Sequence, residues 1–233
     1  MSKTEDLKYE ILTEEINDYD LIFKLIVVGD SGVGKSCLTM RGTKNCFEEC
    51  YSPTVGFEFC TFCIKINGQY IKLQIWDTCG QEIYKSLITS FYRNASLAIL
   101  VYSIDNQNSF NNIETWLNEI KSQSNPEIKI FLIGNKADLE DDRNITFETA
   151  EQFSKEHSFN YFIETSAKTG LNAQNVFIQA SKELYLLNYE YNHRLSKIRL
   201  FSHDKNQKDI NMNVNNILLN DEDNRPSKRK KCC

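Results

Sequence analysis

Glycine, proline and long apolar runs are all scarce in this chain of 233 residues. The chain contains 9 Gly and 3 Pro, too few for a collagen repeat or a low-complexity protein. Its longest apolar runs, such as 97–102, are far shorter than the roughly 18 residues that span a bilayer. With 41% hydrophobic residues, the composition is instead that of a globular protein with a buried core.

A surplus of positive charge is also missing. The formal net charge is -5, from 27 Lys and Arg against 32 Asp and Glu, so the chain lacks the basic excess typical of nucleic-acid binding. We therefore expect no nucleic acid as a partner. The charge is unevenly distributed, because residues 189–233 carry 10 Lys and Arg against 6 Asp and Glu.

The first residues contain no apolar stretch of the kind that directs secretion. We therefore expect the 8 cysteines to lie in a reducing compartment rather than in a disulfide scaffold. Cys60 and Cys63 have the spacing of zinc ligands, but they lie in an apolar segment typical of a strand. Residues three apart in a strand face opposite sides, so we expect the pair to hold no metal.

Apolar runs typical of buried strands alternate with helical stretches between residues 23 and 187. This alternation predicts an α/β sheet with helices on both faces. Asn67 and Gly68 predict the turn of a hairpin over 64–73. The predicted strands are 23–28, 59–66, 71–76, 97–103, 128–133 and 161–164, and the predicted helices are 35–43, 109–122, 147–157 and 173–187.

Three regions follow from this pattern. Residues 1–19 form a polar N-terminal extension, which we expect to be loose. Residues 20–188 form the folded domain. Residues 189–233 are rich in Asn and basic side chains, which predicts a flexible, solvated tail.

The sharpest motif is G-x-x-x-x-G-K-S, which lies between a predicted strand and a predicted helix. In this context the pattern predicts a phosphate loop, whose backbone amides face phosphate oxygens at the positive end of the helix. Lys35 would reach the β and γ phosphates, and the Ser36 hydroxyl would bind Mg²⁺. The residues expected to contact phosphates are Asp30, Ser31, Gly32, Val33, Gly34, Lys35, Ser36 and Cys37.

A phosphate loop does not choose the base, so the base must be read elsewhere. Asn135, Lys136 and Asp138 follow a predicted strand at its C-terminal end, where open α/β sheets bind ligands. The Asp138 carboxylate could accept hydrogen bonds from the N1–H and the amine of guanine, a pattern that adenine lacks. Asn135 could tie this loop to the phosphate loop, and the Lys136 stem could lie along the base.

Four motifs together resemble the Ras-like small GTPases in order and spacing. They are the phosphate loop, Trp76–Glu82, Asn135–Asp138 and Glu164–Lys168. The resemblance covers roughly residues 20–188. It implies the G-domain fold of the P-loop NTPases, in which a mostly parallel six-stranded sheet has one antiparallel edge strand. It also implies GTP and GDP as ligands, Mg²⁺ as the metal and GTP hydrolysis as the activity.

Within this superfamily the chain most resembles the Rab family. The resemblance rests on Thr54–Phe59, which is similar to the Rab effector region, on Ser90–Ala95, and on the pair Cys232 and Cys233.

The resemblance assigns the following catalytic and metal-binding roles. Thr54 should bind Mg²⁺ through its hydroxyl and the γ-phosphate through its amide, and Asp77 should hold Mg²⁺ through water. Gly80 should bind the γ-phosphate, Gln81 should orient the attacking water, and Lys35 should contact the transferred group. At the base, Phe47 should lie edge-on to the guanine. Ser166, Ala167 and Lys168 should complete the base site.

Several positions depart from the family pattern. Cys79 stands where alanine is usual, residues 83–87 lack the usual aromatic and arginine pattern, and Asn94 replaces a usual glycine. Two alternatives therefore stay open beside a cycling Rab switch. One is a guanine-nucleotide-binding adaptor that no longer cycles, and the other is a Ras-like signalling GTPase of another branch.

The tail predicts a membrane anchor. Two lipid chains, or one chain beside basic residues, give stable membrane binding, and residues 228–231 are all basic. Prenylated Cys232 and Cys233 would place the protein on the cytosolic face of intracellular membranes, from which it would cycle through the cytosol. The resemblance implies vesicle trafficking as the process and a monomer as the assembly. The partners that it implies are an exchange factor, a GTPase-activating protein, Rab effectors, an escort protein and a GDP-dissociation inhibitor.

Overall fold

The computed structural model describes residues 7–48, 57–78 and 91–203, and it describes side chains as far as residue 194. The chain divides into two compact units, residues 1–186 and 187–233. Several predicted residues lie outside the described ranges. They are Thr54, Cys79, Gly80, Gln81, residues 83–87 and 228–231, Cys232 and Cys233.

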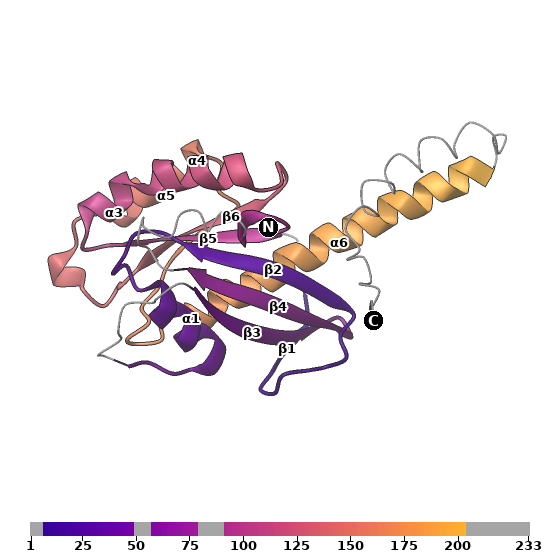
Figure 1. The fold of residues 1–233 in the computed structure, drawn as a ribbon, viewed down its shortest axis with the longest axis horizontal. Helices are drawn as coiled ribbons and strands as arrows, with labels where there is room; N and C mark the ends of the chain where they lie inside the picture. Colours follow the sequence, from indigo (N-terminus) through magenta and orange to yellow (C-terminus); the bar gives the residue numbers. More distant parts are fainter. Residues whose placement is uncertain (1–6, 49–56, 79–90, 204–233) are drawn as a thin grey trace, which may run out of the picture. The chain divides into compact units, whose positions relative to one another are not determined.

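The first unit is built on one sheet of seven strands, in the order β1-β3-β4-β2-β5-β6-β7 (Figure 1). The neighbours β4, β2, β5, β6 and β7 pair in parallel, and β3 pairs antiparallel with both β1 and β4. The predicted α/β sheet is therefore confirmed. The strands are β1 (Tyr9–Leu12), β2 (Leu21–Val28), β3 (Phe57–Ile66), β4 (Gln69–Thr78), β5 (Leu97–Ser103), β6 (Lys129–Asn135) and β7 (Tyr161–Glu164).

The predicted hairpin is also confirmed. β3 and β4 pair from Phe57 opposite Thr78 to Ile66 opposite Gln69. The two residues between the strands, Asn67 and Gly68, both have positive φ, at 47° and 89°. This is the backbone that a two-residue hairpin turn requires.

The sheet has seven strands where the sequence predicted six, because part of the N-terminal extension that we expected to be loose forms a strand. Residues 9–12 form β1, which pairs with Cys63–Ile66 of β3, so β3 is not the edge of the sheet. The ring of Tyr9 lies 4.5 Å from the Lys182 ammonium. Beyond the strand, Glu15 pairs with Lys72 at 2.6 Å. These contacts hold part of a segment whose polar composition had indicated a loose chain.

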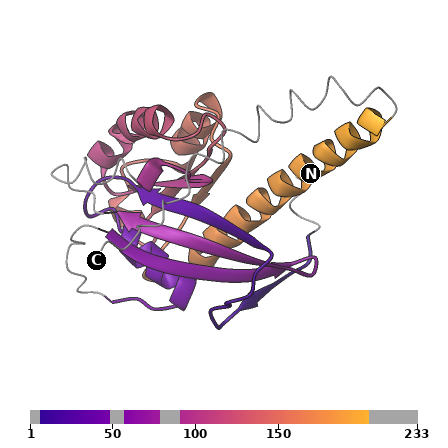
Figure 2. The same ribbon diagram turned by 45° about the vertical axis from the view of Figure 1, so that its right-hand side comes forward.

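Helices cover both faces of the sheet. Figure 1 and Figure 2 show α3, α4 and α5 over one face, and α1 with the first turns of α6 over the other. Gly42 allows α1 and α6 to approach closely, because a Cβ there would lie 2.4 Å from the Phe177 ring. The helices are α1 (Lys35–Lys44), α3 (Gln107–Asn111), α4 (Ile113–Gln123), the short η2 (Glu140–Asp142), α5 (Phe147–Glu156) and α6 (Ala173–His203).

Two helix predictions need correction. The predicted helix 109–122 is divided at Asn112 into α3 and α4, and Asn106 caps α3 by accepting a hydrogen bond from the Ser109 amide. The helix predicted to end at residue 187 continues to His203. The first part of the expected flexible tail is therefore helical, and residues 187–203 of α6 belong to the second unit.

The core lies on both sides of the central strand β5, which is buried along its whole length. On the α4 side, buried apolar residues of β2, β5 and β6 pack against Phe110, Trp116 and Ile120. On the other side, Phe62 contacts Phe177 of α6, with ring centroids 5.8 Å apart. Within residues 7–48, 57–78 and 91–203, no helix combines the length and the apolar character needed to cross a membrane.

Candidate functional site

The predicted phosphate loop lies between the C-terminal end of β2 and the start of α1. Gly34 is the N-cap of α1 and has φ 91°, a left-handed conformation that favours glycine. A Cβ at this position would lie 2.4 Å from the Asn135 side-chain nitrogen. Gly34 is therefore required by its backbone and by its neighbour, and the loop opens onto a helix N-terminus, which attracts anions.

Lys35 is held at the centre of this loop. Its ammonium donates hydrogen bonds to the carbonyl oxygens of Gly29 at 2.9 Å and Asp30 at 2.7 Å. The side chain is buried, although lysine is seldom buried unless it is paired. A buried cation among carbonyl oxygens at a helix N-terminus is suited to binding a phosphate group.

Ser36 and Asp77 meet beneath the phosphate loop. The Ser36 hydroxyl donates a hydrogen bond to Asp77 Oδ2, and both residues are buried. Burial raises the pKa of Asp77 to about 6, against the opposing effect of the bond from Ser36. Asp77 Oδ1 is buried and accepts no hydrogen bond. The two residues therefore offer a hydroxyl and a carboxylate with an unused oxygen, which fits a hard cation such as Mg²⁺.

Among the residues that the structure describes, no group of three or more His, Cys, Asp or Glu side chains could hold a metal ion. Cys60 and Cys63 are both buried in β3, three residues apart, so they face opposite sides of the sheet.

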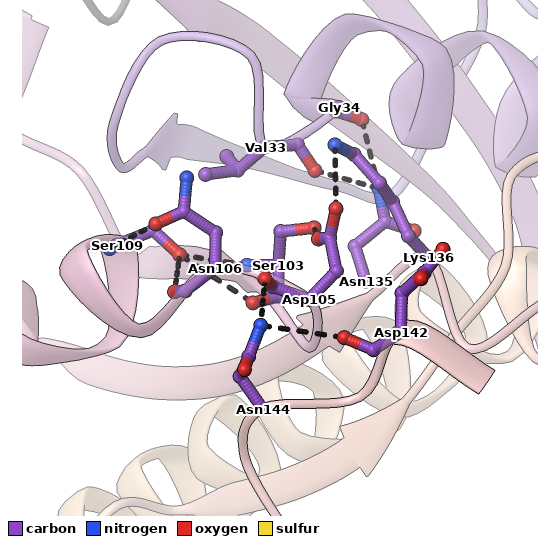
Figure 3. Close-up of polar contacts among 10 residues, drawn as sticks. All are labelled: Val33, Gly34, Ser103, Asp105, Asn106, Ser109, Asn135, Lys136, Asp142 and Asn144. Atoms are coloured by element: carbon purple, nitrogen blue, oxygen red, sulfur yellow. Dashed lines mark hydrogen bonds and ion pairs between the residues drawn. The ribbon is translucent and has the colours of Figure 1, made fainter. Parts of the chain in front are cut away.

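Asn135 connects the loop after β6 to the phosphate loop. Its side-chain nitrogen donates to the carbonyl oxygens of Val33 at 2.9 Å and Gly34 at 3.3 Å. Its Oδ1 accepts a hydrogen bond from the Thr165 hydroxyl at 3.1 Å. Figure 3 shows the amide directed at the two carbonyl groups. One buried amide thus joins three loops, as the sequence suggested for two of them.

The predicted base-binding residues lie together. Ser166 donates its hydroxyl to Asp138 Oδ1, and the same hydroxyl accepts from the Thr169 amide at 3.1 Å. Ala167 is buried beside them. Lys168 is tied to α1, because Arg41 donates to its carbonyl oxygen at 3.0 Å. The Asp138 carboxylate is thereby held at the C-terminal end of the sheet.

Lys136 has a charged partner that sequence reasoning missed. It adopts φ 63°, and its ammonium lies 3.9 Å from Asp105 Oδ2 (Figure 3). Asp105 is in turn held by the Ser103 hydroxyl and by the side chain of Asn144, which donates to its carbonyl oxygen. The pairing places the Lys136 ammonium beside the segment that follows β5.

A second group that sequence reasoning missed is the ion pair between Arg143, which follows η2, and Glu164 of β7. We call the segment 135–143, from the end of β6 to Arg143, the base loop. Arg143 donates two hydrogen bonds to Glu164, at 2.7 and 2.8 Å, and two to Glu140, at 2.8 and 2.7 Å. The bonds to Glu164 and then to Glu140 raise the pKa of Arg143, and those from Arg143 lower the pKa of Glu140. No local pattern signals these contacts, since Arg143 and Glu164 are 21 residues apart.

Two predicted residues are placed less tightly. Phe47 is half-buried, three residues after the end of α1, in the segment that precedes residues 49–56. Cys37 is half-buried in the first turn of α1, where burial raises the pKa of its thiol. Neither observation assigns a role to the side chain.

Comparison with protein-family models gives a match to the Ras family over residues 24–186. The matched range contains the phosphate loop, Asp77, Asn135–Asp138 and Glu164–Lys168. The family match therefore covers the motifs on which the resemblance to the Ras-like small GTPases rests.

Proposed function

Because this chain belongs to the Ras family of small GTPases, we propose that it is a Rab-type switch that controls intracellular vesicle trafficking. Ras-family proteins bind guanine nucleotide with Mg²⁺ and hydrolyse GTP. In the proposed protein, Asp138 selects guanine, Lys35 holds the phosphates and Gln81 orients the attacking water. In this proposal the GTP-bound form recruits effectors to a membrane and the GDP-bound form does not.

The observation that carries this proposal is an exposed aromatic group on β3 and β4. Phe57 and Phe59 of β3 are 45% and 46% exposed. Both contact Trp76 of β4, with ring centroids 5.3 and 5.2 Å apart; the Phe57 ring is tilted against Trp76 and the Phe59 ring meets it edge-on. Phe91 lies 4.6 Å from Phe57 and 5.0 Å from Trp76 by the same measure. Exposed aromatic side chains that gather in one place are typical of protein-binding surfaces.

The ammonium of the half-buried Lys24 contacts two rings of this aromatic group. The Lys24 ammonium lies 5.5 Å from the centre of the Trp76 ring and 5.9 Å from that of Phe91, and it donates to the Arg93 carbonyl oxygen at 3.1 Å. Burial lowers the pKa of Lys24. The cation–π contacts favour one arrangement of the rings, which suits a surface read by a partner.

The position of the aromatic group in the chain supports a nucleotide-dependent partner. Phe57 begins β3 directly after the segment that contains Thr54, and Trp76 lies three residues before Cys79 and four before Gly80. Thr54 and Gly80 are the residues that the family resemblance assigns to the γ-phosphate. A change in either segment would therefore act next to the aromatic rings.

The membrane part of the proposal rests on the sequence alone. Cys232 and Cys233 follow four basic residues, 228–231. Two prenyl chains would give stable anchoring, and the basic run would add attraction to an anionic leaflet. An escort protein would present the chain for prenylation, a GDP-dissociation inhibitor would extract it, and an exchange factor and a GTPase-activating protein would drive the cycle.

Prenyl transfer with purified enzymes separates a Rab from other Ras branches. We expect the GDP-loaded full chain to receive two isoprenoid groups in a reaction that requires the Rab escort protein, as measured by mass spectrometry. Cys232→Ser and Cys233→Ser should each receive one, and the double variant none. Transfer that does not need the escort protein, or no transfer, would favour another Ras-like branch.

Single-turnover hydrolysis separates a cycling switch from a non-cycling adaptor. The GTP-loaded chain should hydrolyse its nucleotide slowly, and a cell extract should accelerate this as a source of activating protein. Gln81→Leu should lose most of the acceleration, because Gln81 positions the water in this account. A parent whose GTP persists with and without extract would support the adaptor.

A further inference from the structure

The carboxylate of Asp30, in the phosphate loop, is held by two side chains of α4. Its Oδ1 accepts a hydrogen bond from the indole nitrogen of Trp116 at 2.8 Å. Its Oδ2 accepts one from the side-chain nitrogen of Asn112, also at 2.8 Å. The Asp30 carbonyl oxygen accepts from Lys35. The residue is thus fixed through its side chain and its backbone together.

The two donors are themselves firmly placed. Trp116 is 6% exposed and belongs to the hydrophobic core on the α4 side of the sheet, so packing fixes its ring. Asn112 is the N-cap residue of α4, and its carbonyl oxygen accepts from the Trp116 amide at 3.1 Å. Residues four apart lie on the same face of a helix. α4 therefore presents both donors to one carboxylate.

The charge of Asp30 makes this placement important for an anionic ligand. Both donors are neutral, so they bring no positive charge to the loop that would hold a polyphosphate. Both oxygens of the Asp30 carboxylate accept hydrogen bonds from side chains of the α4 region. Without these donors, the carboxylate could turn toward the phosphates and repel them, and the loop would lose its attachment to a helix.

We propose that Trp116 and Asn112 are positioning residues, which hold Asp30 on α4 and thereby slow the release of bound nucleotide. This inference rests on the guanine-nucleotide binding of the proposed function. It assigns to α4 a part in nucleotide retention, although neither residue belongs to the nucleotide-binding motifs. An i, i+4 pair on a core helix carries no sequence signal for such a role.

The test measures the release of fluorescent GDP from the full chain in excess unlabelled GDP and Mg²⁺. Trp116→Phe keeps an aromatic ring and removes the N–H. Because a hydrogen bond to a charged group is strong, we expect release to be about tenfold faster. Asp30→Ala removes both hydrogen bonds together with the charge, and release should again be faster than in the parent. The double variant should release nucleotide at the rate of Asp30→Ala alone, because Trp116→Phe then has no hydrogen bond to Asp30 left to break.

A matched control is Tyr92→Phe, which also removes one donor of a buried ring to α4. The Tyr92 hydroxyl donates a hydrogen bond to Glu119 of α4 at 3.2 Å. This bond does not involve the phosphate loop. Release from Tyr92→Phe should stay within about twofold of the parent. Asn112→Ala gives a second variant at an exposed position, where folding is not at risk, and it should accelerate release and couple to Asp30→Ala in the same way.

Several results would overturn the proposal. Release from Trp116→Phe or Asn112→Ala at the parental rate would show that the contacts do not retain nucleotide. Effects of Trp116→Phe and Asp30→Ala that multiply in the double variant would show independent, merely structural roles. A parent that takes up no GDP would overturn the proposed function itself. A parent that binds GDP, together with variants that release it at the parental rate, would overturn only the role of Trp116 and Asn112.

Discussion

The side-chain amide of Asn135 donates a hydrogen bond to the Val33 carbonyl oxygen at 2.9 Å and thereby joins the base loop to the phosphate loop. Asn135 is 1% exposed, so bulk water does not compete for the bond. This bond consequently fixes the separation of the two parts of the proposed nucleotide site.

Asn135→Asp tests this connection, because a carboxylate there would face the carbonyl oxygens of Val33 and Gly34. We expect the free energy of unfolding to fall by about 1–3 kcal/mol and GDP release to accelerate by at least about tenfold. Urea denaturation and fluorescent GDP release measure the two quantities. Asn192→Asp, at an exposed amide of α6, should change neither. A variant that behaves like the parent would show that the two loops are held by other contacts.

The ion pair of Arg143 and Glu164 should stabilise the base loop. Their side chains are 15% and 12% exposed, and removing one partner of such a pair leaves an uncompensated charge. Arg143→Gln should therefore lower the free energy of unfolding by about 3 kcal/mol. The double variant with Glu164→Gln should lose less than the sum of the two single changes.

Chemical denaturation measures these losses, and an exposed pair supplies the comparison. Lys155 and Glu151 are 70% and 44% exposed, so Lys155→Gln should cost less than about 1 kcal/mol. Equal losses for Arg143→Gln and Lys155→Gln would mean that the Arg143 pair contributes no more than a surface pair does.

Removal of residues 1–12 should expose one half of the β3 edge. β1 pairs only with Cys63–Ile66, so hydrogen exchange should accelerate at the amides of this stretch that point away from β4. The amides of Phe57–Phe62, which lie beyond the β1 register, serve as an internal control and should exchange as in the parent. Unchanged exchange at Cys63–Ile66 would contradict the seven-stranded sheet.

The sequence predicted the elements whose signals are local. The strand, glycine-rich loop and helix around Gly34 follow directly from residue order, and Asn67 with Gly68 defines the hairpin turn. Asn135 could be assigned to a loop contact because it ends a buried strand. The C-terminal ends of the parallel strands lie together, and the phosphate loop follows another of these ends. These features depend on a few neighbouring residues.

The features that the sequence did not predict depend on distant residues. Tyr9–Leu12 is only four residues long and lies in a polar stretch, so it does not indicate a strand until β3 is present to pair with it. The bonds from Asp30 to Trp116 and from Arg143 to Glu164 join positions that no periodicity relates. The continuation of α6 to His203 was missed because residues 189–203 were assigned by composition to the tail.

Equilibrium displacement of fluorescent GDP by GTP and ATP tests the central claim most directly, namely that Asp138 makes this a guanine-nucleotide site. GTP should displace the probe, and ATP should bind about 10⁴-fold more weakly, because a site that hydrogen-bonds one base rejects a base lacking those groups. Asp138→Asn should weaken GTP binding by about tenfold or more and favour xanthosine triphosphate, whereas Asp141→Asn, an exposed neighbour, should bind like the parent. Equal displacement by ATP and GTP in the parent would contradict the account.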